Sequence, residues 1–284
     1  MGMTASQQAL LERWNTFLLR LEKRSEELRS EASEGMQQLV DEVLAEEVVQ
    51  TRSVHNALSG IEGRLKNLPD KIEKAWEDEA EPLFDEENED YDETPDLVDI
   101  ALRRRDECLV RLENRVERFK LRWSTALYRQ MWPQVEAALQ QVAECSQCGQ
   151  PMADVDRRFG TRVACSSCGA VNQVMPPAVV STYRAEAPTQ FALEAARSIR
   201  EAIAKHRVEA DRVSEANDWA PEPIESLDQW EALERQYWER YAKVITETGW
   251  EPPEKAEELV ASRMEMFEKQ AILTDQRWRR ARGL

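Results

Sequence analysis

Four of the five cysteines lie close together in the chain, in the two short stretches "CSQCG" and "CSSCG". The first contributes Cys145 and Cys148, the second contributes Cys165 and Cys168, and sixteen residues separate the two pairs. In a C-x-x-C turn both thiolates can point at one centre, and a following glycine accommodates a positive φ. Zinc prefers four soft ligands at tetrahedral corners, and four cysteines leave no open coordination position. The sequence therefore predicts one structural zinc ion without a catalytic role.

The residues between the two cysteine pairs favour a small β unit. Phe159-Gly160-Thr161 suits a turn and "RVAC" suits a strand, so a hairpin can bring the pairs face to face. Metal ligation would supply folding free energy that so small a unit cannot gain from its own core. Redox dithiols or buried free cysteines are the alternative, although thioredoxin-like use expects one C-x-x-C beside a βαβ pattern. Residues 145–168, continuing to Val174, resemble the C4 zinc-ribbon class.

Other residue types that could do chemistry are sparse. The two histidines, His55 and His206, and the remaining cysteine, Cys108, lie in helical patterns typical of surface or packing positions. No Gly-rich phosphate loop, nucleophile elbow or His-Glu metal motif is found. Carboxylate pairs are common, but on helices of this composition they are typical of solvated faces. An enzyme with a carboxylate site on its helices therefore ranks behind a binding protein.

Apolar periodicity predicts a mainly α fold, with long helical hairpins or a bundle interrupted by one small β zinc ribbon. Helices are expected over 6–66, where Gly35, Gly60 and Gly63 mark breaks, and from Pro69, which opens a short helix. Further helices are expected over 189–217, 227–247 and 254–281, after an extended "AVNQVMPPAVVSTY". The domain prediction is an N-terminal helical segment 1–76, an acidic loop 77–96, a long helix 97–144, the zinc ribbon 145–174 and a three-helix region 183–284.

The long helix after the acidic segment has apolar residues at heptad spacing, which predicts a face for partner helices. These residues are Leu102, Leu109, Leu112, Val116, Phe119 and Trp123.

Most of the net charge of −17 comes from one stretch, Glu77–Asp96, which holds twelve acidic residues and no basic one. Such a run predicts a solvated loop that could recognise a basic surface on another protein. No broad basic stripe balances it, so nucleic acid is not expected as a direct ligand. The candidate partner-binding residues are Asp85, Glu86, Glu87, Glu89, Asp90, Asp92, Asp96 and Asp99.

A helical hairpin, an acidic tip and then a C4 zinc module follow one another as in the DksA/TraR-type regulators of bacterial RNA polymerase. The string "PDLVDIA" places Asp96, Asp99 and Ala101 at the P-D-x-x-D-x-A spacing that the tips of such proteins carry. Residues 94–168 thus resemble that family. The resemblance implies that Asp96 and Asp99 approach the active-site channel of the polymerase.

The leading functional prediction is a non-enzymatic adaptor or assembly subunit that binds other proteins, as an oligomer or in a hetero-complex. The polymerase regulator is the second hypothesis and the enzyme is the third. The sequence contains no run of about 18 apolar residues, so no transmembrane helix is predicted. The first residues lack the pattern of a secretory signal. A cytoplasmic protein with reduced cysteines is therefore expected.

Overall fold

The computed structural model describes residues 3–46, 49–88, 97–153, 155–216 and 224–281, and it is mainly α, as the sequence predicts. The N-terminal half consists of α1 (Ala5–Ala45), α2 (Arg52–Ala75), the π-helix η1 (Trp76–Ala80), α3 (Glu81–Asn88) and α4 (Leu97–Gln140). The C-terminal part consists of α5 (Ala178–Ala216), α6 (Ile224–Glu247) and α7 (Glu254–Ala281). Between α4 and α5 lie four short strands, β1 (Ala143–Glu144), β2 (Pro151–Met152), β3 (Thr161–Ala164) and β4 (Val171–Val174).

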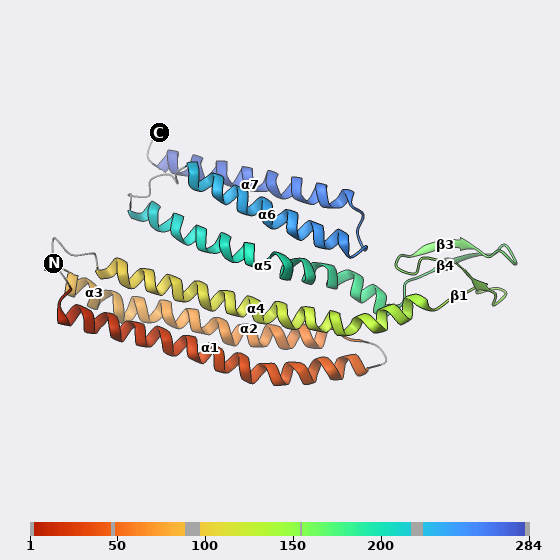
Figure 1. Ribbon diagram of the computed structural model, residues 1–284, viewed down its shortest axis with the longest axis horizontal. Helices are drawn as coiled ribbons and strands as arrows, with labels where there is room; N and C mark the ends of the chain where they lie inside the picture. Colours follow the sequence, from red (N-terminus) through yellow and green to blue (C-terminus); the bar gives the residue numbers. More distant parts are fainter. Residues whose placement is uncertain (1–2, 47–48, 89–96, 154, 217–223, 282–284) are drawn as a thin grey trace.

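The helices pack side by side along one long axis (Figure 1). Helices α1, α2 and α4 contact one another pairwise, α5 packs on α4, α6 on α5, and α7 on α6. The strands form two separate antiparallel pairs, β1 with β2 and β3 with β4. This small β unit lies beyond the end of α4, while the beginning of α1 and the end of α7 lie at the opposite end of the molecule.

Helix α1 begins at a capping box. The hydroxyl of Thr4 accepts a hydrogen bond from the backbone N–H of Gln7 at 3.2 Å, and the Gln7 side chain accepts one from the N–H of Thr4 at 3.0 Å. Two of the otherwise unpaired N–H groups of the first turn are satisfied in this way.

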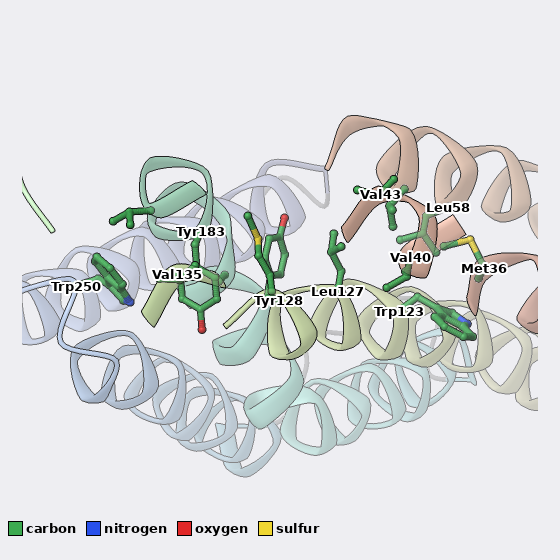
Figure 2. Close-up of a cluster of buried hydrophobic side chains, with 14 of the residues drawn as sticks. Met36, Val40, Val43, Leu58, Trp123, Leu127, Tyr128, Val135, Tyr183 and Trp250 are labelled. Atoms are coloured by element: carbon green, nitrogen blue, oxygen red, sulfur yellow. The ribbon is translucent and has the colours of Figure 1, made fainter. Parts of the chain in front are cut away.

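The central core joins four helices (Figure 2). Met36 and Val40 of α1 and Leu58 of α2 pack with Tyr128 of α4 and Tyr183 of α5 in one buried cluster. Within the heptad stripe of α4, four positions are buried, namely Leu112, Val116, Phe119 and Trp123. Burial of a large apolar side chain contributes about 1.5–3 kcal/mol, so this cluster fixes α5 against the three N-terminal helices.

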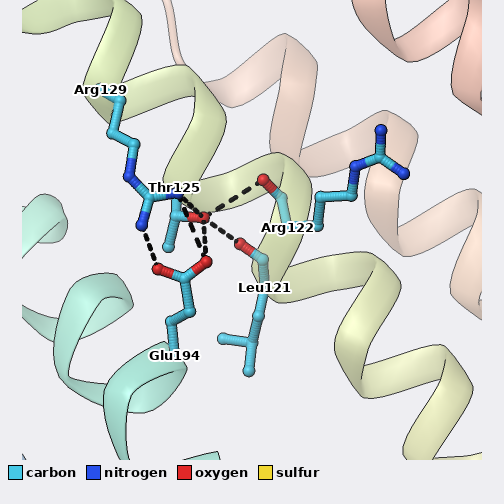
Figure 3. Close-up of polar contacts among 5 residues, drawn as sticks. All are labelled: Leu121, Arg122, Thr125, Arg129 and Glu194. Atoms are coloured by element: carbon cyan, nitrogen blue, oxygen red, sulfur yellow. Dashed lines mark hydrogen bonds and ion pairs between the residues drawn. The ribbon is translucent and has the colours of Figure 1, made fainter.

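Polar contacts also join α4 to α5 (Figure 3). The carboxylate of Glu194 pairs with the Arg129 guanidinium and accepts a hydrogen bond from the Thr125 hydroxyl at 3.1 Å. The same hydroxyl also donates to the carbonyl oxygen of Leu121 at 2.7 Å. The Glu194 carboxylate of α5 thus links this helix to α4.

The prediction of an acidic loop is wrong for residues 77–88, which are helical in η1 and α3. Trp76, Ala80 and Phe84 recur every four residues and are buried, and the Trp76 and Phe84 rings stack with their centroids 5.8 Å apart. Burial of this stripe outweighs the repulsion among carboxylates that point outward. Residues 89–96 lie outside the described part of the chain.

The predicted breaks inside the first helices are also wrong. Helix α1 continues through Gly35, and α2 continues through Gly60, Gly63 and Pro69. A proline inside a helix costs about 3 kcal/mol, but the buried stripe of α2 runs across it, from Leu65 and Leu68 to Ile72. The segment predicted to be extended after the β unit is helical from Ala178. None of the described helices is long and apolar enough to cross a membrane.

Candidate metal centre

Each cysteine pair occupies a tight turn that its own strand pair closes. The Cys145 N–H donates to the carbonyl oxygen of Gln150 at 2.9 Å, and the Cys165 N–H donates to that of Ala170 at 2.8 Å. Gly149 and Gly169 follow the pairs with φ of 72° and 73°, a region that L residues with a side chain rarely adopt. The two turns therefore have the same geometry, although they lie in different strand pairs.

The two turns face each other and bring four thiols together, as the spacing predicts. The Sγ atoms of Cys145 and Cys168 are 3.7 Å apart, as are those of Cys148 and Cys165, and all four lie within 4.8 Å of one another. All four cysteines are free. With metal–sulfur bonds of about 2.3 Å, the edges of a tetrahedral four-sulfur site measure about 3.8 Å. The cluster can therefore hold a metal ion.

Hydrogen bonds favour the thiolate at two of the four positions. The backbone N–H groups of Cys148 and Gln147 lower the pKa of Cys145 to about 6. The backbone of Cys168 and of Ser167 likewise lowers the pKa of Cys165. At Cys148 a backbone hydrogen bond from Gln150 acts in the same direction, but hydrogen bonding to the Cys168 thiol and burial outweigh it and raise its pKa to about 12. The first cysteine of each turn thus has the backbone support that a metal-bound thiolate needs.

Asn172 is a supporting residue that the sequence reasoning missed. It is 5% exposed, and its Nδ2 donates to the Cys145 Sγ at 3.4 Å and to the Ala170 carbonyl oxygen at 3.0 Å. Its Oδ1 accepts hydrogen bonds of 2.8 Å from both the N–H and the hydroxyl of Ser146. Asn172 therefore ties the second strand pair to the first cysteine turn. Its position three residues after Gly169, in the strand that follows the second cysteine pair, was the available indication.

The loop between the two turns contacts the helices. Arg157 donates to the carbonyl oxygen of Gln141 at 2.7 Å, at the end of α4. The Arg184 guanidinium of α5 lies 4.5 Å from the centroid of the Phe159 ring. A Cβ placed on Gly249, in the turn after α6, would lie 3.7 Å from the Arg158 guanidinium. The four-cysteine unit, residues 141–175, therefore touches α5 and the α6–α7 turn, and Arg157 fixes its loop to the residue that follows α4.

The fifth cysteine lies far from this centre. Cys108 is fully buried between α4 and α1, as predicted for a packing residue. Burial, followed by the neighbouring Glu22 carboxylate, raises the pKa of its thiol to about 12. Cys108 is therefore held as an unreactive thiol.

The candidate partner-binding carboxylates are only partly described. Asp85 and Glu86 are exposed on α3, and Asp99 is exposed in the first turn of α4. Glu87 is half-buried, because its carboxylate accepts from the Ser6 hydroxyl at 2.7 Å and its carbonyl oxygen from the Gln7 side chain at 3.2 Å. Glu89, Asp90, Asp92 and Asp96 lie outside the described residues.

The two histidines lie at helix contacts. His55 Nε2 is 2.9 Å from the Tyr128 hydroxyl and 3.1 Å from the Glu186 carboxylate, and so links α2, α4 and α5. His206 Nε2 lies 2.9 Å from the carbonyl oxygen of Ser226 and links α5 to α6. Across the described ranges, the four cysteines are the single group of His, Cys, Asp and Glu residues that could hold a metal ion.

Comparisons with protein-family models, with curated proteins and with solved structures found no match for this chain.

Proposed function

We propose that this chain is a non-enzymatic adaptor in which one structural zinc ion fixes a protein-binding surface at the end of α4. Four thiolates in tetrahedral reach of one another suit zinc, and a closed shell of four leaves no position for substrate. The role of the ion is then mechanical, because the described unit has little core of its own. Free thiols at this centre fit the reducing, cytoplasmic setting that the proposal includes.

The observation that carries the proposal is the exposed apolar surface around the thiols. Of the seven large apolar side chains that are exposed in the described residues, three belong to the four-cysteine unit: Val142 at 61%, Val171 at 70% and Met175 at 61%. Alternate residues of a strand share a face, so Val171 points to the same side as Gln173, and Asn172 points to the thiols. Met175 follows the strand, and its Sδ lies 3.6 Å from the Gln173 Nε2. Apolar side chains that gather on one surface mark a binding site for another protein.

The carboxylates on α3 supply a second element of this proposal. Asp85 and Glu86 are exposed at the end of the molecule opposite the cysteines. Exposed like charges accelerate encounter with a basic surface and lose that effect as salt rises. In the proposal they steer a partner with a basic surface, and the apolar residues of the four-cysteine unit provide a separate contact.

The test is partner recovery with a double variant, Val171→Ser/Met175→Ser. Proteins that co-purify with the wild-type chain are quantified by mass spectrometry, and the variant is expected to lose at least one of them while it retains its metal. Leu19→Ser/Met266→Ser is the matched control, since these two side chains are also exposed, at 64% and 57%, but lie on α1 and α7. Equal recovery by wild type and both variants would remove the basis for the proposal.

A regulator of RNA polymerase is the second candidate, and one arrangement favours it. Helices α2 and α3 run antiparallel to α4, with the cysteines at one end of α4 and the exposed Asp99 at the other. In contrast to a free two-helix hairpin, α1 packs along this pair, and its Trp14 Nε1 donates to the Ala101 carbonyl oxygen at 3.2 Å. Recovery of RNA polymerase with the wild type, and its loss with Asp96→Asn/Asp99→Asn, would establish this candidate instead.

A further inference from the structure

Helix α1 carries two apolar stripes and packs against both α2 and α4. The first stripe is buried and includes Leu11, Trp14, Leu18, Met36, Val40 and Val43. The second stripe is half-buried and includes Leu10, Phe17, Leu21, Leu28, Ala32 and Leu39. Because the second stripe is only half-buried by these two neighbours, α1 keeps accessible apolar surface beside α2.

The second stripe borders a groove between α1 and the α2–η1–α3 rod. Two hollows lie along this groove, one of about 340 Å³ and one of about 250 Å³. All of their lining residues come from α1, α2, η1 and α3, so both open away from α4. We call this surface the α1–α2 groove.

Aromatic side chains form the larger hollow. The buried rings of Trp14 and Phe84 line it, together with the half-buried Phe17, whose ring stacks on Trp14 at a centroid distance of 5.4 Å. Small residues form much of the other hollow. Ala32 and Ala57 line it beside Gly35, where an added Cβ would meet nothing within 4 Å.

Basic side chains without partners edge the groove. Arg13 and Arg20 line the larger hollow and Arg64 lines the smaller one, and all three are exposed. None of them forms an ion pair or hydrogen bond with another described residue, whereas Glu31, which also lines the groove, is paired with Arg24 at 3.6 Å. The exposed Glu79 also lines the larger hollow and forms no ion pair with another described residue. In a chain with a net charge of −17, three unpaired positive charges and one unpaired negative charge thus lie along one apolar groove.

We propose that the α1–α2 groove binds an amphipathic helix of a partner protein, with acidic residues along the edges of its apolar stripe. The groove runs between two long antiparallel helices, where a further helix would pack on α1 and α2 on the side away from α4. The hollows are centred about 20 residues apart along α1, which is about 30 Å, so one helix of that length reaches both. Acidic edges on the bound helix pair with Arg13, Arg20 and Arg64. This surface is distinct from the four-cysteine unit and gives the adaptor a second binding site.

Two synthetic helical peptides of about 20 residues test the proposal. Both carry a leucine stripe at heptad spacing, flanked by glutamate in one peptide and by lysine in the other. Each is labelled and titrated with the full chain, and binding is followed by fluorescence anisotropy. The glutamate peptide is expected to bind about ten-fold more tightly than the lysine peptide, since two or three exposed ion pairs differ between them.

Arg13→Glu/Arg20→Glu should weaken binding of the glutamate peptide about ten-fold and strengthen binding of the lysine peptide. The control is Arg103→Glu/Arg240→Glu, which makes the same charge change at exposed arginines of α4 and α6 and should leave both affinities unchanged. Phe17→Ser should weaken both peptides, because it removes the wall of the larger hollow. Circular dichroism checks that each variant is folded, and the arginine variants, being exposed, keep the test valid if Phe17→Ser is not.

Three results would overturn the proposal: no binding of either peptide, equal binding of both, or equal effects of the two double arginine variants. The proposal would also be overturned if sedimentation showed that the wild type is a dimer and that Phe17→Ser is a monomer. This result would assign the groove to a second copy of the chain. None of these results bears on the Val171 and Met175 surface, so failure here is separable from failure of the proposed function.

Discussion

The two ends of this molecule are held together by different means. At one end, the four-cysteine unit has three buried side chains that belong to its own cluster, Cys145, Met152 and Cys165, and two of these are candidate ligands. At the other end, a cluster of a dozen buried side chains from α1, α2, η1, α3 and α4 includes the aromatic rings of Trp14, Trp76 and Phe84. The first end buries too little apolar surface to fold by this burial alone, whereas the second end buries a dozen side chains in one cluster.

This difference shows which interactions stabilise each end. The cysteine turns are closed by hydrogen bonds between residues a few positions apart. Sixteen residues separate the two cysteine pairs, so these local bonds do not provide the free energy that holds the two turns against each other. A metal ion can supply it. The aromatic end collects residues more than 80 positions apart, as in the hydrogen bond from Trp14 to Ala101. Its order depends on the packing of whole helices.

Metal removal should produce the largest difference between the two ends, because it should unfold one of them and leave the other folded. Structural zinc is worth about 10–16 kcal/mol of apparent folding free energy in small domains, so Cys145→Ser, or a strong chelator, should unfold the four-cysteine unit. Hydrogen exchange of residues 143–175 should rise to that of an unfolded segment, while the helical circular dichroism signal stays within a few percent, roughly, because α1 to α4 do not depend on the ion.

Elemental analysis of the purified chain provides the direct check, with about one zinc per chain expected from the four-ligand argument. Cys108→Ser is the control, because this buried thiol lies outside the centre and its loss should not change the zinc content. Four titratable thiols in a folded, zinc-free chain would contradict the metal hypothesis.

Phe84→Ala should strongly destabilise the aromatic end. The ring is fully buried against Trp76, and truncation of a buried phenylalanine costs about 3–5 kcal/mol. Urea denaturation followed by tryptophan fluorescence measures the loss. Asp85→Ala, at the exposed next position, should change stability by less than about 0.5 kcal/mol. If both variants were equally stable, the acidic segment would be a loop after all.

Asn172→Ala should weaken metal binding without abolishing it. Its side chain orients the Cys145 thiolate and satisfies the Ser146 N–H, and loss of such a supporting residue typically lowers metal affinity by about 10–100-fold. Competition with a chromophoric chelator gives the affinity of the wild type and the variant. Gln173→Ala, at the exposed neighbouring position, serves as control; an identical decrease in both variants would deny Asn172 its positioning role.

The smallest expected effect is a pH dependence of the helical part. Burial alone would raise the pKa of Glu22, but hydrogen bonding to Arg111 and the charges of Arg111 and Arg115 outweigh it and lower the pKa. A lowered folded pKa contributes stability that is present above the unfolded value, near 4.5, and is lost as the pH falls through the folded value.

Glu22→Gln should therefore reduce the loss of unfolding free energy between pH about 5 and about 3, by less than about 1 kcal/mol. Urea denaturation at several pH values measures this slope. Glu12→Gln removes a carboxylate from an exposed position on the same helix and should leave the slope unchanged. A slope that is the same in wild type and Glu22→Gln would show that this carboxylate is equally stabilised in the unfolded chain.

The sequence by itself determined the features that arise within a few residues. The C-x-x-C-G spacing fixes each cysteine turn, because the thiolates and the positive φ of Gly149 and Gly169 depend on neighbours in the chain. The heptad stripe of α4 predicted its buried face, since the helix period alone sets which residues share a side. The mainly α fold with its small β unit followed from such local patterns.

Tertiary structure alone decided the features whose partners are distant. Asn172 gains its role from Cys145 and Ser146, which lie 27 and 26 positions away. The twelve carboxylates predicted a loop from local charge alone. Trp76 and Phe84 pack in one buried cluster with Trp14 of α1, and their burial keeps residues 77–88 helical. The α1–α2 groove likewise depends on how α1 packs against α2, η1 and α3, which places Phe17 and Phe84 in one hollow. Local repulsion and propensity are worth tenths of a kcal/mol per residue, whereas burial of one aromatic ring is worth several times more, so the distant contact prevails.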